Sequence, residues 1–287
     1  MRRLPASTLA LLGVLGLLAA VALLAPWVVP HDPLRQSLLL RLRPPGTVDA
    51  RQGLFALGTD DLGRDLLSRI VYGARASLAV AVLSVAVSLV VGVSLGLLAG
   101  WFRGWTAALV MRLVDTMLSI PAVLLAVLTV AVIGPGFGDL ILVLGLTRWP
   151  RYTRVAYAST LQVAAMPFVQ ASEMAGAGAF RLLRRHVLPN IAGPLMVVAT
   201  SEFGLMILFE AGLSFLGLGI QPPAPSWGSI LAAGRQYVER AWWLTVFPGL
   251  GLFILVVCVN LLGDALRDQL DPRSAGREAA RPGAARH

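Results

Sequence analysis

The stretch that decides the fold class runs from Ala76 to Ala99 and reads "ASLAVAVLSVAVSLVVGVSLGLLA". No charged residue interrupts it. Because a bilayer core needs about 20 apolar residues in one helix, this stretch predicts a membrane-spanning helix. The whole chain is 57% hydrophobic and only 14% charged, far from the composition of a soluble globular domain. The sequence therefore predicts an all-α, polytopic membrane protein.

Five further apolar stretches are long enough to cross a membrane, so the predicted bundle has six transmembrane helices. They run from Leu9 to Val29, Thr106 to Gly134, Leu140 to Ala158, Ile191 to Ile220 and Ala241 to Gly263. Pro121 predicts a kink in the third span. The fourth span is the least apolar, because it holds Arg148, Arg151 and Arg154.

The placement of the arginines predicts the orientation, since cytoplasmic flanks of membrane helices are rich in positive charge. With the N-terminus inside, 15 arginines lie on the inner side and nine on the outer side. Seven of those nine belong to one long polar segment, where the rule is weak. Both termini are therefore predicted to be cytoplasmic.

The first apolar stretch has a second interpretation as a cleaved signal peptide. Arg2 and Arg3 precede it, and the run 20–22 ("AVA") resembles a cleavage site. Apolar sequence continues past that site to Val29, which favours a retained helix.

Composition excludes several functions. The net charge of +9 comes from arginines that are dispersed among apolar runs, so it does not indicate nucleic-acid binding. The three histidines, His31, His186 and His287, are too far apart in sequence to suggest a metal site. Cys258 is the only cysteine. A phosphate-binding Walker A loop needs a lysine, and the chain has none.

One polar segment, Phe168 to Asn190, lies between the fourth and fifth spans and reads "FVQASEMAGAGAFRLLRRHVLPN". It predicts two short helices, 168–175 and 180–188, separated by a glycine hinge at 176–178 and ended by Pro189. Such a cytoplasmic helix pair is suited to docking on a soluble partner. An interfacial helix on anionic lipid fits the same spacing.

This segment resembles the cytoplasmic coupling loop of ABC importer permeases. The signature of that loop is Glu-Ala-Ala, then Gly after three further residues, then Leu-Pro. Here Gln170 replaces the Glu and Ser172 replaces the second Ala, whereas the Gly is kept. The resemblance implies an ATPase-coupling loop made of Gln170, Ala171, Ser172, Gly176, Arg184, Leu188 and Pro189.

Five more blocks narrow the resemblance to the dipeptide, oligopeptide and nickel importer permeases, and within them to the second permease of each system. The blocks are 57–78 ("LGTDDLGRDLLSRIVYGARASL"), 111–126 ("MRLVDTMLSIPAVLLA"), 148–154 ("RWPRYTR"), 209–231 ("FEAGLSFLGLGIQPPAPSWGSIL") and 260–273 ("NLLGDALRDQLDPR"). Their number and order make the resemblance specific.

The resemblance implies an ABC importer permease (MetI-like) fold in a bacterial or archaeal plasma membrane. It implies four parts: a tail with the first helix (1–30), an extracytoplasmic segment (31–75), a permease core (76–265) with the coupling loop 168–190, and a cytoplasmic tail (266–287). The chain would form half of a translocation path and hold no cofactor of its own.

The expected partners are a second permease, two cytoplasmic ATPases that bind ATP and Mg, an extracytoplasmic solute-binding protein and membrane lipid. Peptides are the expected substrate, with nickel or another small solute as the alternative. A secondary transporter would show inverted repeats, and an intramembrane enzyme would need a nucleophile or metal set. The sequence has neither feature.

Polar residues inside the spans or at their ends are expensive in lipid and should face the bundle or a wet cavity. They are Asp115, Glu202, Glu210, Asn260 and Asp264. Either they line the translocation path or they form interhelical hydrogen bonds, and we favour the second role. Glu202 and Glu210 are close to two helical turns apart, so they share one face.

Three residues before the second span, Gly63, Arg64 and Asp65, have two interpretations. They either contact the binding protein or cap the start of the helix. We favour the cap.

Overall fold

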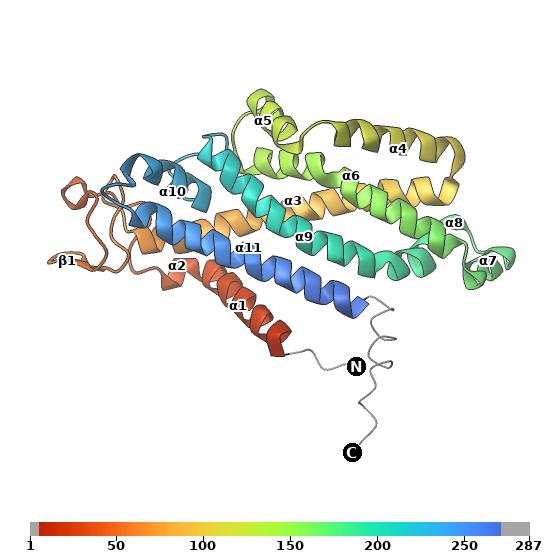
Figure 1. The fold of residues 1–287 in the computed structure, drawn as a ribbon, viewed down its shortest axis with the longest axis horizontal. Helices are drawn as coiled ribbons and strands as arrows, with labels where there is room; N and C mark the ends of the chain where they lie inside the picture. Colours follow the sequence, from red (N-terminus) through yellow and green to blue (C-terminus); the bar gives the residue numbers. More distant parts are fainter. Residues whose placement is uncertain (1–5, 271–287) are drawn as a thin grey trace, which may run out of the picture.

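The computed structural model describes residues 6–270 and shows a bundle of long helices with a polar region at one end. Figure 1 places β1, α2 and α10 at that end, and α7 and α8 at the opposite end. The elements are α1 (Ala6–Leu23), α2 (Ala25–Val28), β1 (Thr47–Asp49), β2 (Gly53–Phe55), α3 (Leu66–Phe102), α4 (Gly104–Ser119), α5 (Ala122–Ile133), α6 (Phe137–Ala164), α7 (Pro167–Met174), α8 (Ala179–Leu182), a π-helical turn (Leu183–Val187), α9 (Leu188–Phe215), α10 (Trp227–Gly234) and α11 (Trp243–Leu270). The predicted helical fold class is confirmed.

Helices occupy all six predicted spans, but they differ in how well they fit a membrane. Three are long and apolar enough to cross it: α3, the continuous helix Ala179–Phe215, and α11. Helices α4 and α5 are long and apolar enough to cross a membrane only when they are taken together. Helix α1 is shorter, and α6 carries the three arginines of the fourth span. The count of six spans stays a prediction. The predicted tail beyond residue 270, His287 included, lies outside the described residues.

The packing of α3 against α6 depends on three glycines spaced four residues apart. A Cβ atom on Gly92 would lie 2.6 Å from the Trp149 carbonyl oxygen, and one on Gly96 would lie 2.5 Å from the Ala156 Cβ. A Cβ atom on Gly100 would lie 2.6 Å from the Thr160 Cβ. Small residues at this spacing let two membrane helices approach closely, so α3 and α6 form one rigid unit.

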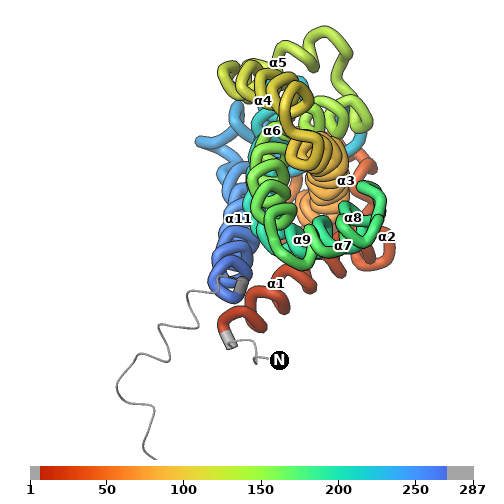
Figure 2. The backbone as a smooth tube through the Cα atoms, turned by 90° about the vertical axis from the view of Figure 1, so that its right-hand side faces the viewer, coloured from red at the N-terminus to blue at the C-terminus, as the bar shows by residue number. Residues whose placement is uncertain are grey.

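The predicted kink at Pro121 is a break in the structure. Helix α4 ends at Ser119, α5 starts at Ala122, and their axes differ by 91°. Ile120 adopts an extended conformation, with φ −93° and ψ 129°, because the residue before a proline is disfavoured in the helical region. Figure 2 shows α4 and α5 on the side of the bundle away from α1.

The predicted helix end at Pro189 is wrong. Pro189 lies in the first turn of α9, and the helix continues from Ala179 to Phe215 without a gap. A π-helical turn at Leu183–Val187 precedes it, with the Leu188 N–H donating to the Leu183 carbonyl. The wider turn accommodates the proline, which is tolerated in the first turn of a helix.

Several span boundaries also differ from the prediction, and two of them have a clear local cause. Helix α3 begins at Leu66, ten residues before the predicted start at Ala76, because a polar cap and not apolarity defines its first turn. Helix α9 ends at Phe215 and not at Ile220, because Gly217 turns the chain with φ +81°.

Candidate functional site

The segment 168–190 is anchored firmly to the bundle. Val169 of α7, Val187 of the π turn and Ile191 of α9 are fully buried. They share one core with Val93 of α3 and Tyr152 of α6. The segment is therefore held by apolar contacts on its inner side and moves with the helices behind it.

The outer side of this segment presents a different surface. Gln170 is exposed, and the large side chains of Met174 and Phe180 are 84% and 78% exposed. Gly176, at the turn between α7 and α8, has φ +88°, a conformation that favours glycine. The remaining predicted coupling residues also lie at or near the surface: Ala171, Arg184, Leu188 and Pro189 are exposed and Ser172 is partly buried.

Local hydrogen bonds stiffen the segment. The Ser172 hydroxyl donates to the Phe168 carbonyl at 2.8 Å, and the Ala177 N–H donates to the Ser172 carbonyl at 3.1 Å across the Gly176 turn. The Phe168 ring lies 6.0 Å from the His186 ring, so α7 also touches the π turn. The predicted hinge is thus a tight, hydrogen-bonded turn.

An ion-pair cluster around one buried carboxylate joins α6 to α9, and its second arginine, Arg151, is 54% exposed. Glu202 is 1% exposed and accepts from Arg148 Nε at 2.9 Å and from Arg151 Nη1 at 3.0 Å. The Arg148 guanidinium also lies 4.9 Å from the centre of the Phe209 ring. One buried carboxylate is therefore shared by two arginines from the neighbouring helix.

Glu210 lies two turns further along α9 and is completely buried. Its Oε1 accepts from the Ser214 hydroxyl at 2.8 Å, whereas Oε2 has no hydrogen-bond partner. The Ser226 hydroxyl, before α10, donates to the Ser214 hydroxyl at 3.4 Å, and the Ser77 hydroxyl of α3 accepts from the Trp227 N–H at the start of α10, also at 3.4 Å. Glu210 therefore belongs to a cage of hydroxyl groups where α3, α9 and the start of α10 meet.

The other predicted polar residues are exposed on this chain. Asp115 of α4 pairs with Arg154 of α6 at 2.6 Å, and their side chains are 63% and 54% exposed. Asn260 and Asp264 of α11 are exposed. The favoured interhelical role is therefore observed for Glu202 and for Asp115.

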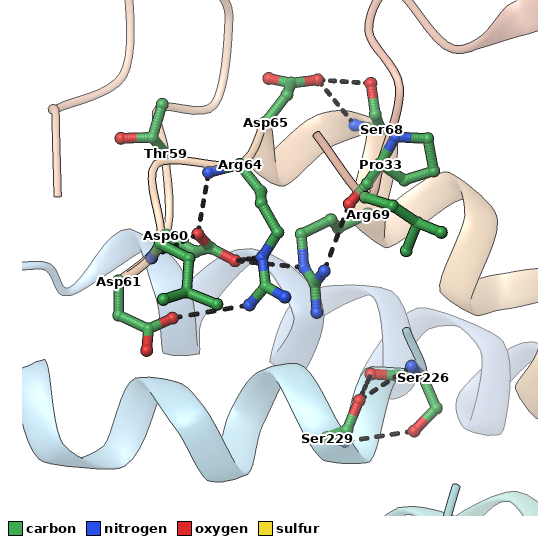
Figure 3. A network of polar contacts seen from close by, with 12 residues as sticks. Pro33, Thr59, Asp60, Asp61, Arg64, Asp65, Ser68, Arg69, Ser226 and Ser229 are labelled. Atoms are coloured by element: carbon green, nitrogen blue, oxygen red, sulfur yellow. Dashed lines mark hydrogen bonds and ion pairs between the residues drawn. The ribbon is translucent and has the colours of Figure 1, made fainter. Parts of the chain in front are cut away.

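A polar network at the hairpin end fixes the start of α3 (Figure 3). The Asp60 carboxylate accepts from Arg64 Nε at 2.6 Å and lies 3.3 Å from Arg69 Nε. Asp65 caps α3, because its Oδ2 accepts from the Ser68 N–H at 2.9 Å. Asp65 therefore caps the start of α3, as the favoured interpretation of this stretch proposed. Helix α10 starts with a capping box between Ser226 and Ser229.

The side chains in this network leave little surface for a partner. Arg64 is 8% exposed and Asp65 is 2% exposed. Gly63, with φ +71°, packs so closely on the Ser37 backbone that a side chain would clash. The main contacts of these three residues are therefore within the polar end of this chain.

A family model described as the inner membrane component of binding-protein-dependent transport systems matches residues 92–276. This match covers more than half of the chain, including segment 168–190 and both buried glutamates. The chain belongs to this family.

Individual relatives of this permease family extend the match towards the N-terminus. A di/tripeptide transport system permease protein DppC of Pseudomonas aeruginosa is 48% identical over 92% of this chain and 88% of that protein. The dipeptide transport system permease protein DppC of Escherichia coli is 46% identical over 88% and 84%. A probable D,D-dipeptide transport system permease protein of Escherichia coli is 38% identical over 93% and 87%.

The permease fold is also found among solved structures. A chain from an inward-facing structure of the MetNI methionine ABC transporter superposes with a TM-score of 0.57 and 22% identity, over 72% of this chain and 98% of that chain. The predicted MetI-like fold is confirmed. The chain is a multi-pass inner-membrane transport subunit that works with a binding protein.

Sequence reasoning missed two features of this permease. It named Glu202 but not its partners Arg148 and Arg151, and the available signal was the unusual placement of arginines inside an apolar span. It also missed the three glycines of α3, whose spacing of four residues was visible in the sequence.

Proposed function

We propose that this chain is one of two permease subunits of an ABC importer for short peptides and forms half of its translocation path. The carrying observation is the 48% identity to a di/tripeptide permease over 92% of the chain. A second peptide permease, at 46% identity, supports the same substrate class. Short peptides are therefore the expected cargo.

The proposed complex contains a second permease, two cytoplasmic ATPases that bind ATP and Mg, and an extracytoplasmic solute-binding protein. In our proposal both termini and segment 168–190 face the cytoplasm. The β1–β2 hairpin and α10, at the opposite end of the bundle (Figure 1), then face the binding protein. Phospholipid surrounds the helices between the two ends.

The coupling step follows from how segment 168–190 is attached. It connects α6 directly to α9, and its buried residues pack on both helices. The Glu202 cluster ties the same two helices together deeper in the bundle. A rigid-body push on α7 by an ATPase therefore moves α6 and α9 together. To change the ratio of two conformations of the permease from 1:99 to 99:1, the ATPases must favour one conformation over the other by about 5.5 kcal/mol.

The ATPase contact is proposed to lie on the exposed side of α7 and the turn after it. Gln170 keeps the length and acceptor oxygen of the usual Glu and loses its charge. Met174 and Phe180 add exposed apolar surface of the kind that anchors protein interfaces. Asn260 of α11 is exposed on this chain, so it is our candidate for facing the translocation path.

Reconstitution tests the substrate class. The purified complex, with its own binding protein, is placed in phosphatidylethanolamine and phosphatidylglycerol vesicles with ATP inside, and uptake of a radiolabelled dipeptide is measured. Unlabelled di- and tripeptides should compete with uptake, whereas Ni²⁺ should not. Uptake of ⁶³Ni without dipeptide uptake would assign the chain to the alternative substrate.

Two glycines of the coupling segment provide a matched test of the ATPase contact. Neither has an atom within 4 Å of an added Cβ, but Gly176 has φ +88° and Gly178 has φ −68°. Gly176→Ala should therefore strain the turn and lower dipeptide uptake, while Gly178→Ala should leave uptake unchanged.

Gln170→Ala should weaken ATPase binding by about 0.5–1.5 kcal/mol, the value of one hydrogen bond. Unchanged ATPase affinity in Gln170→Ala and unchanged uptake in Gly176→Ala would remove the contact from this segment.

A further inference from the structure

An apolar cavity of about 790 Å³ lies between α1 and the rest of the bundle. Four helices line it: α1 through residues such as Leu18, α3 through Ala79, α9 through Phe203 and α11 through Val259. Figure 2 shows α1 at the edge of the bundle beside α11. The cavity therefore lies where an edge helix meets the helical core, next to the surrounding lipid.

Two polar residues line this cavity, Thr200 and Arg75. The Thr200 hydroxyl already donates to the Val197 carbonyl at 2.9 Å. Arg75 is exposed, and within residues 6–270 its side chain forms no ion pair or hydrogen bond. The cavity thus offers one available positive charge and otherwise apolar walls.

The positive charge lies at one end of the cavity. Helix α1 ends and helix α3 begins at the hairpin end (Figure 1). Leu23 is the last residue of α1 and Arg75 lies in the first third of α3, so both are at the part of the lining nearer to the hairpin. The α3 lining continues to Val85, which is about 15 Å further along the helix at 1.5 Å per residue. The cavity is therefore elongated along α3, and in the orientation proposed above, on which this inference rests, Arg75 lies at its outer mouth.

Water is a poor occupant of such a space. A buried water needs two to four polar partners, and the only hydroxyl in the lining is already bonded. An empty cavity of this size forfeits dispersion contacts along its whole wall. An occupant with a long apolar part and an anionic group at one end matches the walls and the charge.

We propose that this cavity binds one acyl chain of a phospholipid from the outer leaflet, with the lipid phosphate held by Arg75. The acyl chain fills the space between α1 and the other three helices. The phosphate meets the guanidinium at the mouth, where arginines commonly reach lipid headgroups. The lipid then serves as a packing element that attaches the first helix to the bundle.

Native mass spectrometry of the purified, delipidated transporter complex, titrated with phosphatidylglycerol, tests the site. Arg75→Gln should weaken the tightest phosphatidylglycerol site roughly five-fold, the usual effect of one basic residue near a membrane surface. Arg75→Lys should restore it, because the positive charge returns.

A cavity-filling pair of variants separates this site from general lipid contact. Ala79→Trp places an indole in the cavity and should abolish the tightest site. Ala86→Trp is the matched control, since Ala86 is exposed on the same helix two turns further and does not line the cavity. Equal lipid binding by the two variants, or unchanged affinity in Arg75→Gln, would overturn the proposal.

Photo-crosslinking identifies the occupant in native membranes. The chain has one cysteine, so Leu18→Cys in a Cys258→Ala background can carry a benzophenone into the cavity. Irradiation should give a phospholipid adduct detectable by mass. A crosslink to the second permease in its place would show that a protein subunit fills the cavity and would refute lipid binding.

Discussion

Glu202 and Glu210 are two buried carboxyl groups on one helix with opposite surroundings. They lie about two turns apart on α9 and are 1% and 0% exposed. Arg148 and Arg151 both pair with Glu202. Glu210 accepts a hydrogen bond from the Ser214 hydroxyl, and none of the described residues 6–270 forms an ion pair with it. Burial is equal, but the partners differ in charge.

The difference gives each carboxyl group a different role. A buried charge is stabilised where opposite charges compensate it, and two arginines of α6 compensate Glu202 in this way. We therefore expect Glu202 to link α6 to α9 electrostatically. Glu210, which accepts from Ser214 on its own helix, is expected to contribute only through polar contacts with hydroxyl groups.

The largest expected effect comes from removing the charge of Glu202. Glu202→Gln keeps the shape but leaves Arg148, whose side chain is 9% exposed, without a counter-charge. Breaking a buried ion pair from one side costs about 3–5 kcal/mol. The free energy of unfolding, measured by denaturant titration of the purified chain in detergent, should fall by that amount.

A double-mutant cycle with Arg148→Gln is the control for this prediction. If the two side chains act through each other, the double variant should lose less stability than the sum of the single variants, by about 0.5–3 kcal/mol. Strict additivity would show that the ion pair contributes nothing of its own, and the contrast with Glu210 would then disappear.

A smaller loss of stability is expected on mutation of Phe209. This residue is next to Glu210 in sequence, but its ring contacts Arg148 of the Glu202 cluster. Its ring faces the Arg148 guanidinium at 4.9 Å, and a desolvated cation–π contact contributes about 2 kcal/mol. Phe209→Leu should lower the free energy of unfolding by about that amount. Phe203→Leu on the same helix is the control, and equal losses in both variants would leave only apolar packing as the cause.

The sequence was sufficient to predict where Glu202 and Glu210 lie, but not which residues they pair with. Their spacing placed Glu202 and Glu210 on one face of a helix, and an apolar environment followed from the flanking residues. The partners of Glu202 come from α6, about fifty residues earlier, and pairing across such a distance depends on how the helices cross. The close approach of α3 and α6, through Gly92, Gly96 and Gly100, is one of the contacts that set how α6 lies in the bundle.

Two of the differences from the sequence analysis occurred at prolines, where local rules give two answers. Pro121 breaks a helix and Pro189 does not. At Pro121 the preceding residue is extended, whereas Pro189 follows a π turn whose hydrogen bond from the Leu188 N–H to the Leu183 carbonyl ends just before it. The polar segment 168–190 is recognisable in the sequence because its glycines and arginines contrast with apolar flanks, and its coupling role stays a prediction. Its rigidity depends on Val169 and Val187, whose burial requires the whole bundle.

Glu210→Gln should have a smaller effect than either change near Glu202. A glutamine keeps the acceptor for the Ser214 hydroxyl, and its amide nitrogen replaces Oε2, which has no hydrogen-bond partner, so no existing hydrogen bond is lost. Polar contacts between membrane helices average about 0.6 kcal/mol, with about 1.7 as the largest measured. The same denaturant titration should place Glu210→Gln within that range. A loss as large as that of Glu202→Gln would indicate that Glu210 is ionised and has a charge partner in the folded chain.

The smallest effect is expected at the exposed ion pair between Asp115 and Arg154, which extends the comparison from buried to exposed carboxylates. Its 2.6 Å distance is shorter than those of the Glu202 cluster, yet both side chains are more than half exposed. Exposed ion pairs contribute about 0.2–1 kcal/mol because solvent screens the charges and both side chains lose freedom. Asp115→Asn should therefore change the free energy of unfolding by no more than that, and the effect should shrink further in 0.5 M salt. A loss comparable to that of Glu202→Gln would show that distance, and not burial, determines the strength of ion pairs in this bundle.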